Sequence, residues 1–184
     1  CKRYGINTIS TYDKLATKNN IAFFNFRCNR VNRIVHKKQN QPKDTSIVNG
    51  INIYKGLIVQ CKKHYQKKGI KTFVNNLYKI EQIGKFITVV DVNDEMNKLC
   101  IDRNEFFKIF TLSYCNTCHS LQGCSIDNDI TIFDANTPYV NRYWLYTAIT
   151  RARELSRITI FIHDDSEVEM LQECKLKQYL NNKI

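Results

Sequence analysis

The stretch Ile130–Ile162, ITIFDANTPYVNRYWLYTAITRARELSRITIFI, decides the fold class of this chain. Two short apolar runs, Ile130–Asp134 and Arg157–Ile162, have the length and composition of buried strands. Between them, apolar residues repeat at helical spacing over Asn141–Glu154. These residues are Leu145, Ala148, Ile149 and Ala152. A strand, a helix and a second strand in this order predict an α/β domain with a parallel sheet flanked by helices.

The same pattern occurs near the start of the chain. Ile21–Phe26 is a strongly apolar run that predicts a strand buried on both faces. From Arg27 onward the spacing becomes helical, and Val31, Ile34 and Val35 fall on one face. The opposite face is expected to carry the basic residues, which are Arg27, Arg30, Arg33, Lys37 and Lys38. A last helix is expected to begin at Ser166, where Ser166 and Glu169 form a capping-box pattern.

Residues 51–103 show strand patterns and no helical period. Short apolar runs alternate there with turns, at residues 51–54, 57–61, 77–83, 86–92 and 98–101. They predict a small antiparallel β module inserted into the α/β frame. We therefore expect residues 1–50 and 104–184 to form two parts of one α/β domain. Phe110–Tyr114 is expected to be a strand of that frame, leading into a turn that carries cysteines.

The composition is that of a globular protein with a strong excess of positive charge. The chain has 184 residues, 43% of them hydrophobic, with 6 glycines and 2 prolines, which excludes collagen-like and low-complexity classes. Lys and Arg exceed Asp and Glu by 11, as expected for a protein that binds nucleic acid, an anionic membrane or acidic partners. The richness in Ile, Lys and Asn is an alternative source of this charge, since AT-rich coding sequence produces it without selection for binding. Such a genome would suit a large DNA virus or a parasite.

The sequence shows no secretory segment, and its cysteines are scattered. We therefore expect an intracellular, reducing setting, whether nucleus, cytoplasm or a viral replication site. No apolar run approaches the roughly 18 residues of a membrane span, so no membrane partner is expected. Cys1 stands where an initiator methionine would, so we expect the chain to be a piece of a longer protein. The eight cysteines are scattered, apart from Cys115–His119, CNTCH, which has the spacing of a haem attachment or half a zinc site. The remaining histidines form no second pair, so no metal is expected, although a redox or metal protein stays an alternative.

Two segments carry more chemistry than packing requires. The first, Thr117–Gly123, sets polar side chains around a glycine after a buried strand, and its hydroxyl groups suit phosphate oxygens. The second, Tyr146–Arg153, places Arg151 between the small residues Ala148 and Ala152. A permanently charged guanidinium in such a place suits the charge that develops on a transferring phosphoryl group.

These segments resemble motifs of superfamily 1 helicases. Residues 114–126, YCNTCHSLQGCSI, resemble motif V, and residues 146–153, YTAITRAR, look like motif VI. FFNFRCNRVN, residues 23–32, is similar to motif IV of the Pif1- and RecD-like branch. The module at residues 51–103 stands where that branch carries an SH3-like insertion. The resemblance thus implies the C-terminal RecA-like domain of such a helicase.

The resemblance also implies roles for individual residues. Arg151 would be the arginine finger on the γ-phosphate of ATP, and thus the catalytic residue of this chain. Other residues would line the nucleotide: Gln122, Gly123, Ser125 and Tyr146. Ser125 stands where several relatives carry a glutamate that contacts the ribose. A third set would contact the nucleic acid: Asn25, Thr117, His119, Ser120 and Thr147.

The chain contains no G-x-x-x-x-G-K-[ST] sequence, so the resemblance assigns most contacts with ATP and Mg²⁺ to an N-terminal RecA-like domain of the same parent chain. This chain alone is expected not to hydrolyse ATP. Its other expected partner is single-stranded nucleic acid, and the Pif1-like character favours DNA and a part in DNA replication. The alternative is a RecA-like module that binds nucleic acid or a partner protein without motor activity.

Overall fold

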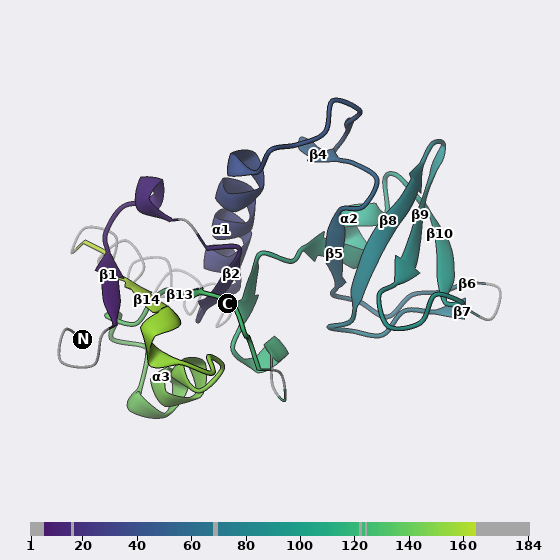
Figure 1. The fold of residues 1–184 in the computed structure, drawn as a ribbon. Coiled ribbons are helices and arrows are strands. Elements are labelled where there is room, and N and C mark those ends of the chain that lie inside the picture. The colour runs from purple at the N-terminus through teal and green to yellow at the C-terminus, as the bar shows by residue number, and fades with distance from the viewer. Residues whose placement is uncertain (1–5, 16, 68–69, 122, 124, 165–184) are drawn as a thin grey trace, which may run out of the picture. The chain divides into compact units, whose positions relative to one another are not determined.

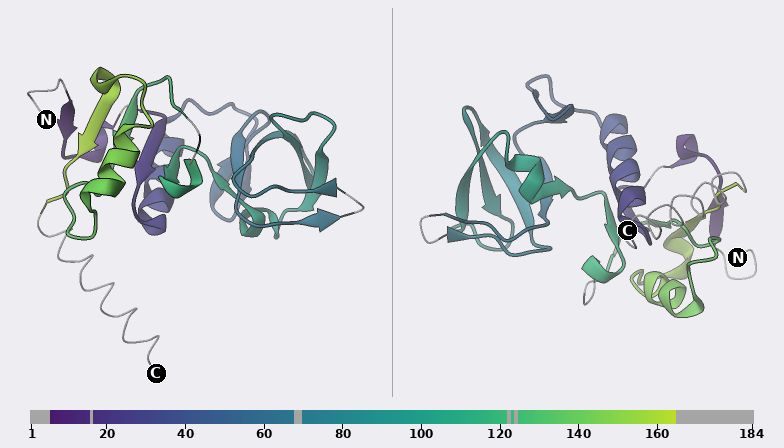
Figure 2. Two further views of the ribbon diagram at one scale, coloured as in Figure 1. Left: turned by 90° about the horizontal axis from the view of Figure 1, so that it is seen from below. Right: turned by 180° about the vertical axis from the view of Figure 1, so that it is seen from behind.

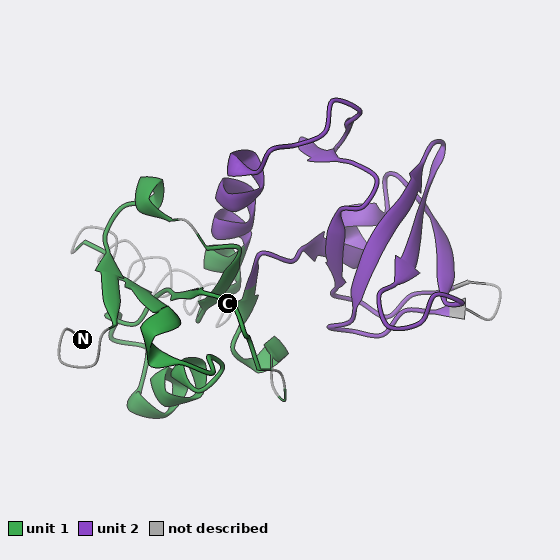
Figure 3. Cartoon of the chain, in the orientation of Figure 1, with its two compact units in different colours: residues 1–28, 116–184 green, residues 29–115 purple. Residues whose placement is uncertain are grey.

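The computed structural model describes residues 6–15, 17–67, 70–121, 123 and 125–164 (Figure 1). The helix predicted at Ser166 lies outside these residues. The chain forms two compact units (Figure 3). The first comprises residues 1–28 and 116–184, and the second comprises residues 29–115.

The first unit is built on a five-stranded parallel sheet. From edge to edge the strands are β1 (Asn7–Ile9), β14 (Ile158–Phe161), β13 (Ile130–Ile132), β2 (Asn19–Ala22) and β12 (Cys115–Thr117). The central β13 pairs in parallel with both β14 and β2, and β1 pairs in parallel with β14. Because parallel neighbours need a crossover connection, a helix lies between β13 and β14 in the sequence. The predicted fold class, a parallel sheet flanked by helices with an antiparallel insertion, is confirmed.

The central strand of this sheet is buried on both faces, but only one face is apolar, because Thr131 on the other face pairs with Asn20 and Thr159. All three residues of β13 are buried, and Ile132 pairs with Ile21 on one side and Ile160 on the other. The core extends to Ile158 and to Ala148 of the following helix. In the described part of this unit, 3₁₀ turns join its elements at Tyr12–Lys14, His119–Leu121 and Leu155–Arg157.

The helix α3 (Arg142–Ile149) is shorter than the predicted helix over Asn141–Glu154. Its start is as expected, since the side chain of Asn141 accepts a hydrogen bond from the Trp144 N–H at 2.9 Å. It ends early because the backbone beyond Thr150 pairs with another segment, through a parallel bridge between Ala152 and Ile126. Ala152 therefore reaches the core from a turn and not from a helix.

The helix α1 (Asn25–Lys38) begins two residues before the predicted start, and β2 ends at Ala22. The strand predicted over Ile21–Phe26 is thus wrong beyond Ala22. The reason is tertiary: a carboxylate oxygen of Asp134 accepts the N–H groups of Phe23 at 3.0 Å and Phe24 at 3.3 Å, which turns the chain into the helix.

The faces of α1 also differ in part from the prediction. Val31 and Val35 are buried as expected, and Ile34 is half-buried. Arg27 was expected on the basic outer face, but only 1% of it is exposed. It is buried because Asp134, also buried, supplies a charge partner.

Among the described residues, no helix has both the length and the apolar character that a membrane span requires.

The second unit contains a five-stranded antiparallel sheet. Its strands, in spatial order, are β10 (Lys98–Asp102), β9 (Phe86–Asp91), β8 (Leu77–Ile83), β5 (Ile58–Cys61) and β11 (Phe110–Leu112). They curl around an apolar core in the left view of Figure 2. Two hairpins and a short helix accompany them: β3 (Ser46–Val48) with β4 (Ile51–Ile53), β6 (Gln66–Lys67) with β7 (Ile70–Lys71), and α2 (Phe106–Ile109).

Alternation along the strands explains this sheet. In β8 and β10 buried residues alternate with exposed ones, so one face of each strand enters the core. Tyr78 in that core is fully buried, and burial raises its pKa to about 12. The five strand runs predicted between residues 51 and 101 are all confirmed.

One strand belongs to a different sheet from the one expected. Phe110–Leu112 was assigned to the α/β frame, but β11 pairs antiparallel with β5. The frame strand that leads into the cysteine-bearing turn is β12 instead. The antiparallel sheet therefore extends past residue 103, and the second compact unit is larger than the predicted module.

Candidate functional site

The polar segments of interest follow strands of the parallel sheet. β2 leads into Asn25, β12 leads into Thr117–Leu121, and β13 leads into Asp134. In an open α/β sheet, ligands bind outside the carboxyl ends of the strands. The carboxyl edge of this sheet is therefore the candidate site.

The turn after β12 is stabilised by its own hydroxyl groups. Thr117 Oγ1 accepts a hydrogen bond from the Ser120 N–H at 3.3 Å. Ser120 Oγ donates to the main-chain oxygen of Thr117 at 2.9 Å. His119, between them, is exposed. The three residues predicted to contact nucleic acid are thus brought into one compact polar turn, in which backbone N–H groups and hydroxyls lie close together.

Gly123 follows this turn in a conformation that favours glycine. Its φ is +83°, in the left-handed region, while a Cβ at this position would meet nothing within 4 Å. The backbone angle and not crowding therefore selects glycine here. Ser125 is exposed. Gln122, predicted to line the nucleotide, lies outside the described residues.

Arg151 lies beyond the end of α3 and contacts the turn after β12. Its Nη1 donates to the main-chain oxygen of Leu121 at 3.3 Å, and its Nε donates to the Thr147 oxygen at 3.2 Å. The residue is partly buried. The guanidinium was expected to project from a helix, but here it bridges the last turn of α3 and the segment that resembles motif V.

The backbone joins the same two segments. The Ile126 N–H donates to the Arg151 oxygen at 2.7 Å, beside the parallel bridge between Ile126 and Ala152. Arg153 adds an exposed ion pair, with its Nε 2.6 Å from Asp127 Oδ1. The segments that resemble motifs V and VI are thus joined by both side-chain and backbone contacts.

The other predicted residues of α3 lie on its outer surface. Tyr146 is 70% exposed. Thr147 is also exposed, and its hydroxyl donates to the Tyr143 oxygen of its own helix at 2.8 Å. Asn25 is exposed at the start of α1, following the strand next to β12. Asn25 and the turn after β12 therefore share one edge of the sheet.

The cysteines of the CNTCH sequence face inward. Cys115 and Cys118 are buried free cysteines, and Cys118 packs with Ile21 and Ile130. Burial raises the pKa of the Cys118 thiol, an effect that the positive charge of Arg151 reduces. No group of three potential metal-ligating side chains occurs among the residues that the structure describes.

A buried charged cluster at the same edge was missed by the sequence analysis. Arg27 Nε lies 3.1 Å from Asp134 Oδ1, and Arg27 Nη1 donates to Tyr12 Oη at 2.8 Å. His163 Nε2 accepts the N–H of Asp134 at 3.1 Å. An acid directly after a buried strand was the available signal. Its partner Arg27, 107 residues away, was not readable from the sequence.

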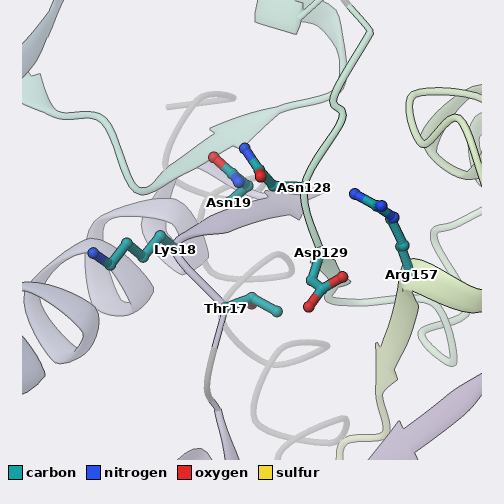
Figure 4. A pocket seen from close by; sticks show the side chains of 6 residues that line it. All are labelled: Thr17, Lys18, Asn19, Asn128, Asp129 and Arg157. Atoms are coloured by element: carbon teal, nitrogen blue, oxygen red, sulfur yellow. The ribbon is translucent and has the colours of Figure 1, made fainter.

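An open pocket of about 670 Å³ lies at the opposite, amino edge of the sheet (Figure 4). Its lining residues lie at or just before the first residues of β2, β13 and β14, and they are Thr17, Lys18, Asn19, Asn128, Asp129 and Arg157. The Lys18 side chain extends away from Asp129 and Arg157. None of the site residues predicted from the sequence lines this pocket.

Comparisons with solved structures identify a similar fold. A Pif1 helicase from Bacteroides bound to single-stranded DNA matches with a TM-score of 0.55 at 17% identity, over 93% of this chain and 48% of that one. The fold resembles that of Pif1 helicases. Pif1 helicases studied at forked double-stranded DNA match with a TM-score of 0.54 at 18% identity, over 86% of this chain and 44% of theirs. Pif1 from Candida albicans matches with a TM-score of 0.53 at 8% identity, over 93% and 51%.

At these low identities, the TM-scores show a shared fold alone. The chain spans about half the length of the Pif1 structures that it matches. No protein-family model matches the sequence, and no curated protein is similar enough in sequence to count as a relative.

Proposed function

We propose that this chain is the C-terminal RecA-like domain of an ATP-dependent superfamily 1 DNA helicase of the Pif1-like branch. The observation that carries this proposal is the joining of the two segments that resemble motifs V and VI. Arg151 bonds to the Leu121 oxygen, and the Ile126 N–H bonds to the Arg151 oxygen. A domain that converts nucleotide hydrolysis into movement along a strand needs such a mechanical link between its nucleotide side and its nucleic-acid side.

In this proposal the chain works with an N-terminal RecA-like domain that holds most of ATP and Mg²⁺. The antiparallel sheet is part of an SH3-like module inserted between the two parts of the frame, and because it includes β11 the module extends beyond the predicted boundary at residue 103. ATP supplies the phosphoryl group whose charge needs stabilising during transfer. Arg151 supplies that stabilisation as an arginine finger, after its guanidinium exchanges the carbonyl oxygens of Leu121 and Thr147 for phosphate oxygens.

The remaining roles follow from where the residues lie. Gly123 and the exposed Ser125 and Tyr146 lie on the two segments that Arg151 joins. They are assigned to the nucleotide side, together with Gln122. The turn of Thr117, His119 and Ser120, with Asn25 at the same edge of the sheet and Thr147 on α3, is assigned to single-stranded DNA. Hydroxyl and backbone N–H groups recognise phosphates in a way that does not depend on base sequence.

The first test is turnover by the protein that carries both RecA-like domains. Arg151→Ala is expected to lower kcat for ATP by about 10³-fold or more while ATP binding and the melting temperature change little. Arg153→Ala is the matched control, because Arg153 is a neighbouring arginine whose exposed side chain pairs with Asp127. Near-normal turnover of Arg151→Ala overturns the assignment.

A second test measures strand binding by the chain itself. Because the proposed contacts are mostly to phosphates, affinity for a single-stranded oligonucleotide should fall steeply between about 50 and 200 mM salt. An affinity that does not change with salt contradicts the proposed grip.

The alternative is a RecA-like module that binds nucleic acid or a partner protein and does no motor work. The observation that favours it is the engagement of the Arg151 guanidinium with carbonyl oxygens of its own domain. The sequence that precedes this chain in the parent protein separates the two functions. A G-x-x-x-x-G-K-[ST] loop followed by an acidic pair supports the motor.

A further inference from the structure

Five aromatic rings form a group beside the carboxyl edge of the parallel sheet in the first unit, and a sixth, Tyr143, precedes one of them on α3. Three come from the end of β2 and the start of α1, and three come from the loop after β13 and from α3. They are Phe23, Phe24, Phe26, Tyr139, Tyr143 and Trp144.

Five of these rings form a continuous series of contacts. Phe26 stacks on Phe24, with ring centroids 5.1 Å apart and planes inclined by 25°. Phe24 meets Phe23 and Tyr139 edge to face at 4.9 Å and 5.8 Å. Phe23 meets Trp144 edge to face at 5.6 Å. Such offset and T-shaped arrangements hold aromatic rings in fixed orientations.

Two of the six rings remain open to solvent. Phe26 is 48% exposed and Tyr143 is 68% exposed. Each has a guanidinium near its face, Arg27 at 5.7 Å from the Phe26 centroid and Arg142 at 5.1 Å from the Tyr143 centroid. The base of the series is fixed as well, since Asp134 accepts the N–H groups of Phe23 and Phe24. Phe26 is therefore presented by a rigid support, and Tyr143 is carried by α3 next to Trp144.

The aromatic series lies beside the polar turn that follows β12. β2 and β12 are neighbours in the sheet, and neighbouring strands are about 4.8 Å apart. Phe23 follows the end of β2, and Thr117 ends β12. Hydroxyl groups suited to phosphates thus stand next to rings suited to bases.

We propose that Phe26 and Tyr143 form a stacking platform for the bases of a single strand whose phosphates lie on the turn Thr117–Ser120. This inference rests on the proposed function, since it assumes that this edge binds single-stranded nucleic acid. Base stacking on aromatic rings accepts every base, so it adds affinity without sequence preference. The exposed guanidinium of Arg142 beside Tyr143 adds attraction for the negatively charged strand, whereas Arg27 beside Phe26 is buried and paired with Asp134.

The surroundings favour a nucleic-acid strand over a protein surface as the occupant. The charged side chain at the open end of the group, Arg142, is basic, and the chain as a whole carries an excess of 11 positive charges. Asn25 and Asn141, whose amides suit phosphate or base edges, begin the two helices that carry the exposed rings. A strand has both the phosphates and the π-faces that this combination matches.

The decisive experiment compares two strands that differ only in their bases. The chain is titrated with a fluorescently labelled oligo(dT) and with an abasic oligonucleotide of the same length, and binding is followed by anisotropy. We expect oligo(dT) to bind at least about fivefold more tightly than the abasic strand. Trp144 provides a second readout, because it is the single tryptophan of the chain and belongs to the aromatic series. Its emission should be quenched by oligo(dT) and not by the abasic strand.

Variants assign the effect to the platform. Phe26→Ala is expected to remove most of the preference for oligo(dT) while leaving the affinity for the abasic strand unchanged. Phe26→Trp should keep that preference, because it retains a ring. Phe86→Ala is the matched control, since Phe86 is 44% exposed on β9 of the second unit and should not affect the preference.

The outcomes distinguish failure of the stacking platform from failure of the proposed function. Equal, salt-dependent binding of both strands overturns the stacking platform and leaves the phosphate grip in place. A Phe26→Ala variant that keeps the full preference for oligo(dT) also overturns the platform. Absence of binding to either strand overturns both the stacking platform and the phosphate grip on which it rests.

Discussion

Arg151 Nη1 lies 3.3 Å from the main-chain oxygen of Leu121, which stands 30 residues earlier in the chain. The contact joins the two segments that resemble helicase motifs. A guanidinium held by carbonyl oxygens is oriented but still exchangeable, since neutral carbonyls attract it less than phosphate oxygens do. The contact therefore suits a side chain that leaves its domain when a nucleotide is present.

An exchangeable side chain contributes little to folding. Arg151→Ala should lower the free energy of unfolding by only about 1 kcal/mol, because two hydrogen bonds to partly exposed carbonyl oxygens are lost. Urea unfolding followed by circular dichroism measures the change. A loss above about 3 kcal/mol would identify Arg151 as a structural residue and speak against an exchangeable finger.

The buried pair of Arg27 and Asp134 should behave in the opposite way. Asp134→Asn is expected to cost about 3 kcal/mol or more, because it leaves the guanidinium of Arg27 buried without its counter-charge. The urea midpoint reports this loss. Glu105→Gln is the control, because its pair with Lys108 at 2.7 Å is exposed and should contribute little. Equal midpoints for the two variants would contradict the role of the buried pair.

A double variant tests whether Arg27 and Asp134 act as a pair. Arg27→Met combined with Asp134→Asn removes both charges. The combined loss should be smaller than the sum of the two single losses, because neither partner is then left buried alone. Additive losses would show that the two side chains act independently.

Gly123 offers a test of backbone conformation at the candidate site. Gly123→Ala should destabilise the chain by about 1 kcal/mol, because φ is +83° and a side chain is disfavoured there. Gly123→Asn should cost less, since asparagine tolerates the left-handed region. Gly84, which lies outside that region, is the control, and Gly84→Ala should not be destabilising. Thermal melts of the three variants provide the comparison.

His36 predicts how stability depends on pH. Burial lowers its pKa below 6.5, and its Nε2 donates to the Asn52 oxygen at 2.6 Å. The unfolded chain therefore takes up this proton more readily than the folded chain. Its contribution to stability is present above pH 6.5 and decreases as the pH falls below that value.

The measurement compares urea midpoints at pH 7.5 and pH 5.5. His36→Gln should show a smaller drop between the two than the unaltered chain, because glutamine does not titrate. His64→Gln, at an exposed histidine of the same unit, serves as the control. A drop of the same size in His36→Gln would mean that other groups cause the pH dependence.

Local periodicity was sufficient for most elements of the fold. The strands from Ile51 to Ile101, β13 and β14 were readable because alternating or continuous apolar residues report burial directly. The ends of elements were not. β2 stops at Ala22 because the Asp134 carboxylate turns the next residues into a helix, and α3 stops at Ile149 because the following backbone pairs with Ile126.

Two further features could not be predicted from local sequence: the sheet to which a strand belongs, and the burial of a charged side chain. Phe110–Leu112 has the composition of a strand in either sheet, and only its pairing with β5 assigns it to the antiparallel one. From the sequence, Arg27 is expected on the surface of an amphipathic helix, because the carboxylate that neutralises it, Asp134, is not near it in the sequence. Both results depend on partners more than 45 residues away.

The sequence by itself determined the α/β frame, the antiparallel insertion and the two segments that carry the candidate chemistry, because each is encoded in residues that are adjacent or one helical turn apart. Only the tertiary structure decided that Arg151 bonds to Leu121, that Asp134 anchors Arg27 and the start of α1, and that aromatic rings from two helices form one group. These are contacts between side chains and backbone that lie far apart along the chain. They form only after the strands have taken their order in the sheet, and that order is set by packing of the whole core.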